Sequence, residues 1–223
     1  EDGSIYKFTE KPKNPDCTNA SMGIYIFTKD KLQKYLEEDE ATEGSANDFG
    51  KNIIPNMLAA GEKMFAYPFE GYWKDVGTIS SLWEANMDLL GSNPVLDLGD
   101  HNFRIYSRNQ SGGPQYIGEN AKVVNSYITD GCEIYGTVKN SVLGAGVKVM
   151  PGAYVKDCVL MGDTVIESGA TVNYSIIDTG VTVGVGSIIG EARDTAKGIT
   201  VIGEDLEIPN GTVIASGEII SEL

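Results

Sequence analysis

VVNSYI, at residues 123–128, recurs three times further along the chain, as VKNSVL at 138–143, VKDCVL at 155–160 and VNYSII at 172–177. The four segments begin 15, 17 and 17 residues apart. Such self-similarity at a short period is the mark of a solenoid, in which each repeat packs on its neighbours and is not stable alone. This stretch therefore decides the fold of the C-terminal half of the chain.

A second set of aliphatic residues keeps the same spacing between these segments. Ile134, Val149, Ile166 and Val183 also lie 15, 17 and 17 residues apart, and Gly follows each within a few positions. One aliphatic residue about every six positions, with Gly, Asn and Asp between, predicts coils of three short sides with tight corners. We therefore expect residues 117–223 to form an all-β left-handed parallel β-helix of hexapeptide repeats.

The end of the chain continues this pattern less regularly. Aliphatic residues at 199–202 and 213–214 predict one or two further coils, and residues 192–197 an inserted loop. The Gly-rich stretch at 183–190 resembles a nucleotide-binding loop only superficially, because it lies inside the repeat with no strand-to-helix crossover after it.

The N-terminal part of the chain has a mixed α/β pattern. Apolar segments at 5–9 and 21–27 predict strands, and helices are expected to begin near Thr28, Asp48 and Ser80, the last stopping at Gly91. Residues 92–116 are rich in Asn, Asp, Gly, Ser and Pro, which indicates a connector. The expected parts are an α/β region at 1–91, a connector at 92–116 and the β-helix at 117–223.

Composition excludes several classes of protein. A net charge of −15 argues against a nucleic-acid partner, because phosphate backbones attract basic surfaces. The sequence contains neither an apolar run long enough to span a membrane nor a secretory leader. The three cysteines, Cys17, Cys132 and Cys158, are odd in number and widely spaced, which disfavours a disulfide framework or a metal cluster. These features predict a cytoplasmic protein.

Two short segments carry candidate binding residues. In EKP at 10–12, Lys11 is a compact cation suited to a phosphate, and Glu10 can accept hydrogen bonds from sugar hydroxyls. YWKDVGT at 72–78 places two aromatic residues beside the carboxylate of Asp75, which suits a sugar platform next to a metal. Taken alone, each segment is more often structural than functional. Glu10 and Lys11 would then be an ordinary exposed ion pair, and Trp73 a core residue beside Asp75 in a turn or cap.

Four segments in this order resemble the bacterial glucose-1-phosphate adenylyltransferase family of glycogen biosynthesis. They are EKP at 10–12, ASMGIYIF at 20–27, DFGKNIIP at 48–55 and YWKDVGT at 72–78. The helix around LWEAN at 82–86 and the β-helix also match, so the resemblance covers nearly the whole chain. It implies an α/β remnant of a Rossmann-like nucleotidyltransferase domain followed by the β-helix, in an enzyme that is usually a homotetramer.

The resemblance also implies a reaction and roles for particular residues. The family makes ADP-glucose and pyrophosphate from ATP and α-glucose 1-phosphate with Mg²⁺. Lys11 would bind the phosphate of glucose 1-phosphate, and Asp75 would be one of two carboxylates on the metal. The other implied substrate-binding residues are Glu10, Ser21 and Tyr25 on the sugar, and Asp48, Phe49 and Trp73 lining its pocket.

The family's Gly-rich nucleotide loop and second metal carboxylate belong upstream of EKP and are not in these 223 residues. We therefore expect the chain to be inactive alone, and no catalytic residue is assigned within it. Three other functions stay open: a non-catalytic regulatory subunit of the same enzyme, another sugar-1-phosphate nucleotidyltransferase, and a purely structural assembly module. Acyl transfer by the β-helix is disfavoured because the single histidine, His101, precedes the coils.

Overall fold

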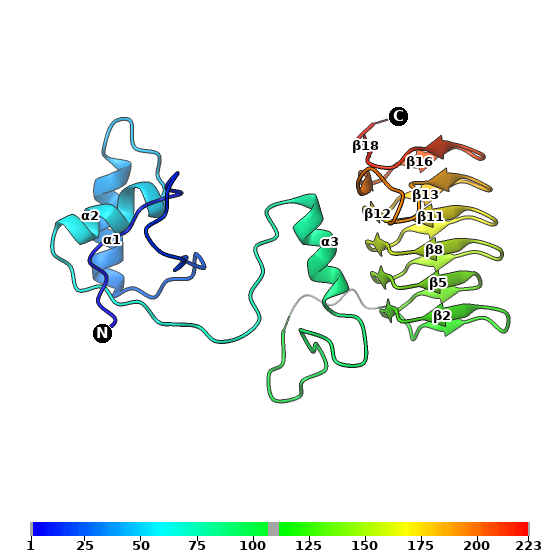
Figure 1. Cartoon of the computed structure of the whole chain (residues 1–223), viewed down its shortest axis with the longest axis horizontal. Coiled ribbons are helices and arrows are strands. Elements are labelled where there is room, and N and C mark those ends of the chain that lie inside the picture. Colours follow the sequence, from blue (N-terminus) through cyan, green and yellow to red (C-terminus); the bar gives the residue numbers. More distant parts are fainter. Residues whose placement is uncertain (1, 107–111, 223) are drawn as a thin grey trace. The chain divides into compact units, whose positions relative to one another are not determined.

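The computed structural model describes residues 2–106 and 112–222. They form two compact units, one ending at Trp73 and the other beginning at Lys74. The second unit contains the helix α3 and the β-helix, which are coloured green to red in Figure 1. Part of the expected connector, residues 107–111, lies outside the described residues.

The first unit has three short helical elements. They are α1 (Lys29–Glu40), the π-helical turn η1 (Phe49–Ile53) and α2 (Ile54–Ala59). Pro55 lies in the first turn of α2, where a missing N–H is tolerated. Tyr35, Ile53 and Met57 are buried together between these elements. The helices expected near Thr28 and Asp48 are therefore confirmed.

The predictions of two strands in this unit are wrong. Residues 5–9 and 21–27 form no strand, and the only antiparallel bridge among the described residues joins Ser4 to Phe65. Ile26, expected inside a buried strand, is 99% exposed. A strand is held by ladder hydrogen bonds to neighbouring strands, and among the described residues of this unit such pairing is limited to the single bridge between Ser4 and Phe65. The apolar composition of 21–27 suits a strand, but the described residues of this unit place no strand beside it.

The second unit is a left-handed parallel β-helix made of three six-stranded parallel sheets, one for each side of the coil (Figure 1). The first sheet consists of β1 (Tyr116–Ile117), β4 (Glu133–Ile134), β7 (Lys148–Val149), β10 (Val165–Ile166), β13 (Thr182–Val183) and β16 (Glu207–Ile208). The second consists of β2 (Lys122–Val124), β5 (Thr137–Lys139), β8 (Tyr154–Lys156), β11 (Thr171–Asn173), β14 (Ile188–Ile189) and β17 (Val213–Ile214). The third consists of β3 (Tyr127–Ile128), β6 (Val142–Leu143), β9 (Val159–Leu160), β12 (Ser175–Ile177), β15 (Thr200–Ile202) and β18 (Ile219–Ile220).

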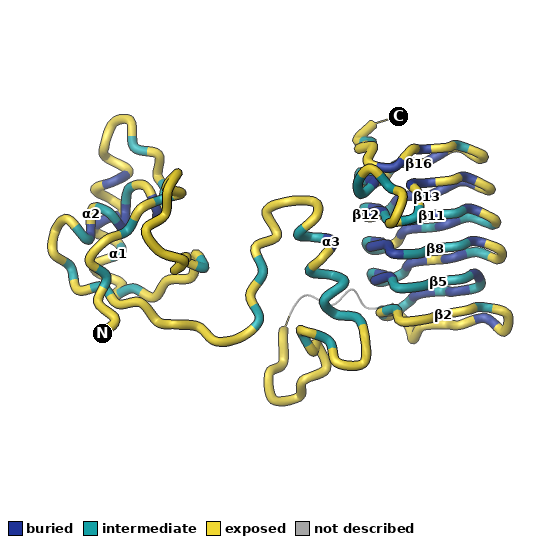
Figure 2. The backbone as a smooth tube through the Cα atoms, viewed as in Figure 1, coloured by how far each residue is buried: buried dark blue, intermediate teal, exposed yellow. Residues whose placement is uncertain are grey.

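The register of these sheets is the one that the repeats predict. Val138 pairs with Val155, and Val155 with Val172. On the first sheet Ile166 pairs with Val149 and Val183. These aliphatic side chains are fully buried and form one continuous core along the coils, where the backbone is dark blue in Figure 2. Both interleaved repeats are therefore confirmed, as are the further coils at β15 and β17.

One corner of the coil is occupied by a column of residues with left-handed backbone. Asn125, Asn140, Asp157 and Tyr174 stand two positions after the inward-facing valine of each repeat, with φ between 42° and 55°. Amide side chains link the first three, because the Asn125 amide donates to Asn140 and the Asn140 amide donates to Asp157. Asn and Asp tolerate this backbone region better than other non-glycine residues, whereas for Tyr it is an outlier.

The inserted loop leaves the solenoid at the same corner. Register partners Ile177 and Ile202 are 25 residues apart in sequence, against 17 for Leu160 and Ile177. The extra residues lie around 192–197, where the N–H groups of Thr195 and Ala196 both donate to the carbonyl of Ala192. The insertion expected there is confirmed.

Helix α3 (Ile79–Met87) begins one residue before Ser80, the expected start. Its N-cap is Thr78, whose hydroxyl accepts the Ser81 N–H at 3.1 Å while Ser81 Oγ accepts the Thr78 N–H at 3.0 Å. This capping box satisfies two N–H groups at once, which explains why the helix starts at Ile79. The expected stop at Gly91 is also wrong, since the helix ends at Met87.

Candidate functional site

The first unit gathers three aromatic rings and a serine. The ring of Tyr25 stacks on Phe49 at 5.9 Å between centroids, and Phe27 lies 5.9 Å from Tyr25 and 5.8 Å from Phe49. The hydroxyls of Ser21 and Tyr25 are 3.0 Å apart, and Ser21 Oγ also accepts the N–H of Gly23 at 3.1 Å. The segment 21–27 and η1 therefore present aromatic faces with hydroxyl groups at their edge.

Two carboxylates border the first turn of η1. Asp48 caps this turn, because its Oδ1 accepts the Lys51 N–H at 2.8 Å. The carboxylate of Glu10 lies against Gly50, so that a methyl group at Gly50 would clash with Glu10 Oε2 and stand 3.4 Å from Asp48 Oδ1. Gly50 thus allows the two acidic side chains to approach each other beside Phe49.

Lys11 brings a cation to the same place. Its side chain is 91% exposed, and its ammonium lies 3.7 Å from Glu10 Oε1. Its φ of 42° lies in the left-handed region, which non-glycine residues rarely adopt and which is often found at binding sites. The ammonium is therefore available to an anionic group that approaches the Glu10 carboxylate.

Six of the eight predicted site residues come together in this way. We call Glu10, Lys11, Ser21, Tyr25, Asp48 and Phe49 the sugar-site cluster. The sequence interpretation missed Phe27 and Gly50, although both stand inside the quoted segments. Aromatic composition alone could have suggested Phe27, whereas Gly50 needed the three-dimensional approach of Glu10.

Trp73 and Asp75 are the two predicted site residues outside this cluster. Trp73 closes the first unit and is 45% exposed. Asp75 belongs to the second unit, where its Oδ1 accepts the N–H of Gly77 at 3.1 Å. Their roles as sugar wall and metal ligand stay predictions.

The segment before α3 is fixed to the helix by charge. The ammonium of Lys74 lies 3.1 Å from Glu84 Oε2 and 3.3 Å from Asp88 Oδ2. The hydrogen bond to Glu84, followed by that to Asp88, raises the pKa of Lys74 against the opposing effect of its partial burial. Lys74 is therefore a structural cation in this unit, and its carboxylate partners are already engaged.

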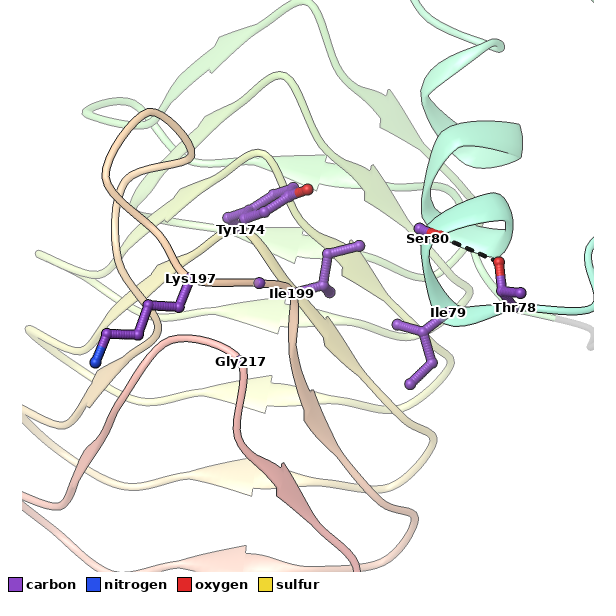
Figure 3. Close-up of a pocket in the computed structure, with 8 residues that line it drawn as sticks. Thr78, Ile79, Ser80, Tyr174, Lys197, Ile199 and Gly217 are labelled. Carbon is purple, nitrogen blue, oxygen red and sulfur yellow. Dashed lines mark hydrogen bonds between the residues drawn. The ribbon is translucent and has the colours of Figure 1, made fainter.

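The β-helix presents no comparable chemistry among its described residues. The Cys158 thiol is fully buried, and desolvation raises its pKa to about 12, so it is not a nucleophile. No group of three His, Cys, Asp or Glu in the described ranges is arranged to hold a metal ion. An open hollow of about 430 Å³ lies between the start of α3 and the coils, but its one charged side chain, Lys197, extends away from α3 (Figure 3).

The sugar-site cluster has the chemistry of a monosaccharide phosphate site. Carboxylates accept hydrogen bonds from sugar hydroxyls, aromatic faces pack against the ring, and a lysine ammonium neutralises a phosphate.

No helix in the described part of the chain has the length and apolar character that crossing a membrane requires.

Comparison with known proteins agrees with this chemistry. A family model described as nucleotidyl transferase matches residues 1–92, and one described as the GlmU-like C-terminal hexapeptide matches residues 114–202. A glucose-1-phosphate adenylyltransferase of Clostridium botulinum is 62% identical over 159 residues, which are 71% of this chain and 41% of that protein.

Other relatives align over more of the chain. The glucose-1-phosphate adenylyltransferase of Clostridium kluyveri is 48% identical over 215 residues, and that of Desulforamulus reducens is 44% identical over 218 residues. Each alignment covers 96% of this chain and 55% of the relative, so the chain spans about half the length of the curated relatives it matches. The chain is therefore similar to nucleotidyl transferases in its first 92 residues, to GlmU-like hexapeptide proteins at 114–202, and to glucose-1-phosphate adenylyltransferases along nearly its whole length.

Proposed function

We propose that the sugar-site cluster binds α-glucose 1-phosphate, and that the protein to which this chain belongs makes ADP-glucose and pyrophosphate from ATP and that sugar phosphate. The observation that carries the proposal is the convergence of Glu10, Asp48 and Lys11 beside the Tyr25–Phe49 stack. Curated relatives at 44–62% identity are named for this activity, which supports the assignment.

The cluster would hold the sugar phosphate for in-line attack. The Lys11 ammonium pairs with its phosphate, and Glu10 and Asp48 accept hydrogen bonds from hydroxyls of the ring. A phosphate oxygen then forms a bond to the α-phosphorus of ATP while the bond from that phosphorus to pyrophosphate breaks. The chain's own contribution is orientation and neutralisation of charge, which are the main means of catalysis in phosphoryl and nucleotidyl transfer.

A divalent ion fits Asp75 only in part. Magnesium is usually held by one or two carboxylates together with phosphate oxygens of the substrate. Asp75 is exposed, and one of its oxygens already accepts the Gly77 N–H, so it supplies one carboxylate and needs further ligands. When bound, Mg²⁺ would neutralise charge on the phosphates. Asp75 therefore enters the proposal as one ligand of Mg²⁺.

The remaining expectations rest on the same relatives. Because the chain spans about half the length of these relatives, we infer that it is inactive by itself. In the intact cytoplasmic enzyme we expect a homotetramer. A structural assembly module is the second candidate, since the β-helix holds the largest of the three buried clusters of the described residues. The sugar-site cluster favours the enzyme, because an assembly module has no need of it.

The proposal is tested in the complete gene product. Formation of pyrophosphate should require both ATP and glucose 1-phosphate, and Lys11→Ala should raise the KM for glucose 1-phosphate more than tenfold while leaving the KM for ATP near that of the wild type. A complete protein that forms no pyrophosphate from these substrates would refute the enzymatic assignment.

A further inference from the structure

Tyr174 holds a strained backbone at a corner that otherwise carries Asn or Asp. Its φ is 42°, and the equivalent residues of the three preceding coils are Asn125, Asn140 and Asp157. A bulky non-glycine residue in the left-handed region is destabilised, and it persists only where its surroundings require it. The side chain of Tyr174 therefore makes a contact that Asn could not make.

That partner is Trp83 of α3. The two rings meet edge to face, with centroids 5.0 Å apart and planes at 84°. Trp83 is 3% exposed, packs with Val159 and Ile176 on the third sheet, and donates its indole N–H to the carbonyl of Asp157 at 2.8 Å. The corner column therefore receives the one buried side chain by which α3 docks onto the coils.

The inserted loop covers this contact from the other side. The guanidinium of Arg193 stands 4.7 Å from the centre of the Trp83 ring and 5.9 Å from that of Tyr174. A guanidinium over an aromatic face is attracted by the ring electrons. Without the eight extra residues of this coil, Arg193 would have no place above Trp83.

The N-terminal end of α3 follows directly on the segment that carries Asp75. Thr78 caps the helix, and Lys74 is paired with Glu84 and Asp88 on the helix itself. Asp75 lies between these two anchors, with its carboxylate turned onto the N–H of Gly77. A shift of α3 on the coils would therefore move both anchors of the segment that carries Asp75.

We propose that Tyr174 and Arg193 form a latch that fixes α3 on the β-helix and thereby positions Asp75 for the metal. They are positioning residues, since neither touches Asp75. The inference rests on the proposed function for the role of Asp75, whereas the latch itself is a property of the second unit.

The experiment compares amide hydrogen exchange in the wild type, Arg193→Ala, Arg193→Lys and Tyr174→Asn. Arg193→Ala should speed exchange of the α3 amides and of residues 75–77 about fivefold, and Arg193→Lys should restore most of the protection. Tyr174→Asn should loosen the same amides while the thermal midpoint of the solenoid stays within about 2 °C of the wild type, because Asn relieves the strained corner. Arg104→Ala, in the connector, is the matched control and should change nothing.

In the complete gene product, Arg193→Ala should raise the Mg²⁺ concentration for half-maximal activity several-fold, with little change in the KM for glucose 1-phosphate. Unchanged exchange in both Arg193→Ala and Tyr174→Asn would overturn the latch. Faster exchange in α3 with residues 75–77 unaffected would overturn its link to Asp75. Absence of activity in the wild type would refute the proposed function and leave the exchange result on the latch intact.

Discussion

Replacement of Gly50 by Ala tests the sugar-site cluster at its narrowest point. A methyl group at this position would clash with Glu10 Oε2 and lie 3.1 Å from Glu10 Cδ. The Glu10 carboxylate is the end of a flexible side chain, so it can move aside while η1 stays in place. The substitution therefore displaces one proposed sugar ligand and leaves the surrounding backbone intact.

The expected loss of affinity follows from the hydrogen bond between the sugar and the Glu10 carboxylate. Hydrogen bonds to a charged group contribute about 1.5–3 kcal/mol, so displacing the carboxylate should weaken glucose 1-phosphate binding by about 10- to 150-fold. The free energy of unfolding should change little. Ala is favoured over Gly within a helix by about 1 kcal/mol, and this gain offsets the cost of moving the Glu10 carboxylate aside. Loss of binding without loss of stability is the expected signature.

Calorimetry and thermal unfolding of the Gly50→Ala chain measure the two quantities. Glu10→Gln, which keeps the shape and removes the charge, should weaken binding by a similar factor. Lys51→Ala, on the same turn with an exposed side chain, serves as the control and should bind like the wild type. Binding by Gly50→Ala that equals the wild type would show that the Glu10 carboxylate beside Gly50 is not a sugar ligand.

Three further predictions concern the second unit and the thiols. Ile166→Ala should lower the free energy of unfolding by about 2–5 kcal/mol, and Val165→Ala, on the outer face of the same strand, by less than about 1 kcal/mol; equal losses in denaturant titrations would contradict the inward register. Thr78→Ala should lose about 1 kcal/mol through the cap, seen as faster hydrogen exchange at the start of α3 and not in the coils. Iodoacetamide at pH 8 should modify Cys17 alone in the folded chain, because the other two thiols are buried and the pKa of Cys158 is about 12; rapid labelling of a second thiol would be inconsistent with the fold.

The β-helix could be predicted because its information is local and repeated. Ile134, Val149, Ile166 and Val183 each occupy the same position in a coil, and every coil buries its aliphatic residue against the next. One misread residue does not disturb such a pattern. The corner residues were harder to foresee, since only the structure shows that Tyr174 takes the place of Asn.

The first unit could be predicted only in part. The helices carry their own apolar faces, and Asp48 caps η1, so α1 and the η1–α2 pair could be predicted from the sequence. The segment 21–27 has the composition of a buried strand, but a strand depends on partners that lie elsewhere in sequence, and Ile24 and Ile26 stand 73% and 99% exposed. Amino-acid composition shows that a segment is suited to a strand, but the segment becomes a strand only where another strand pairs with it.

The site shows the same division. Residues that stack or bond within short segments, such as Ser21 with Tyr25, were grouped correctly. The approach of Glu10 to Gly50 joins residues forty positions apart and depends on the absence of a side chain, which no pattern in the sequence reports. Trp73 and Asp75 were proposed through family resemblance, and their roles remain predictions.

The most direct test of the account is calorimetric titration of this chain with α-glucose 1-phosphate, with and without Mg²⁺, beside Lys11→Ala and the neighbouring control Lys13→Ala. The account predicts binding that Lys11→Ala weakens more than tenfold and that Lys13→Ala leaves unchanged. Binding that is indifferent to Lys11→Ala would contradict it, as would the absence of binding in both this chain and the complete gene product.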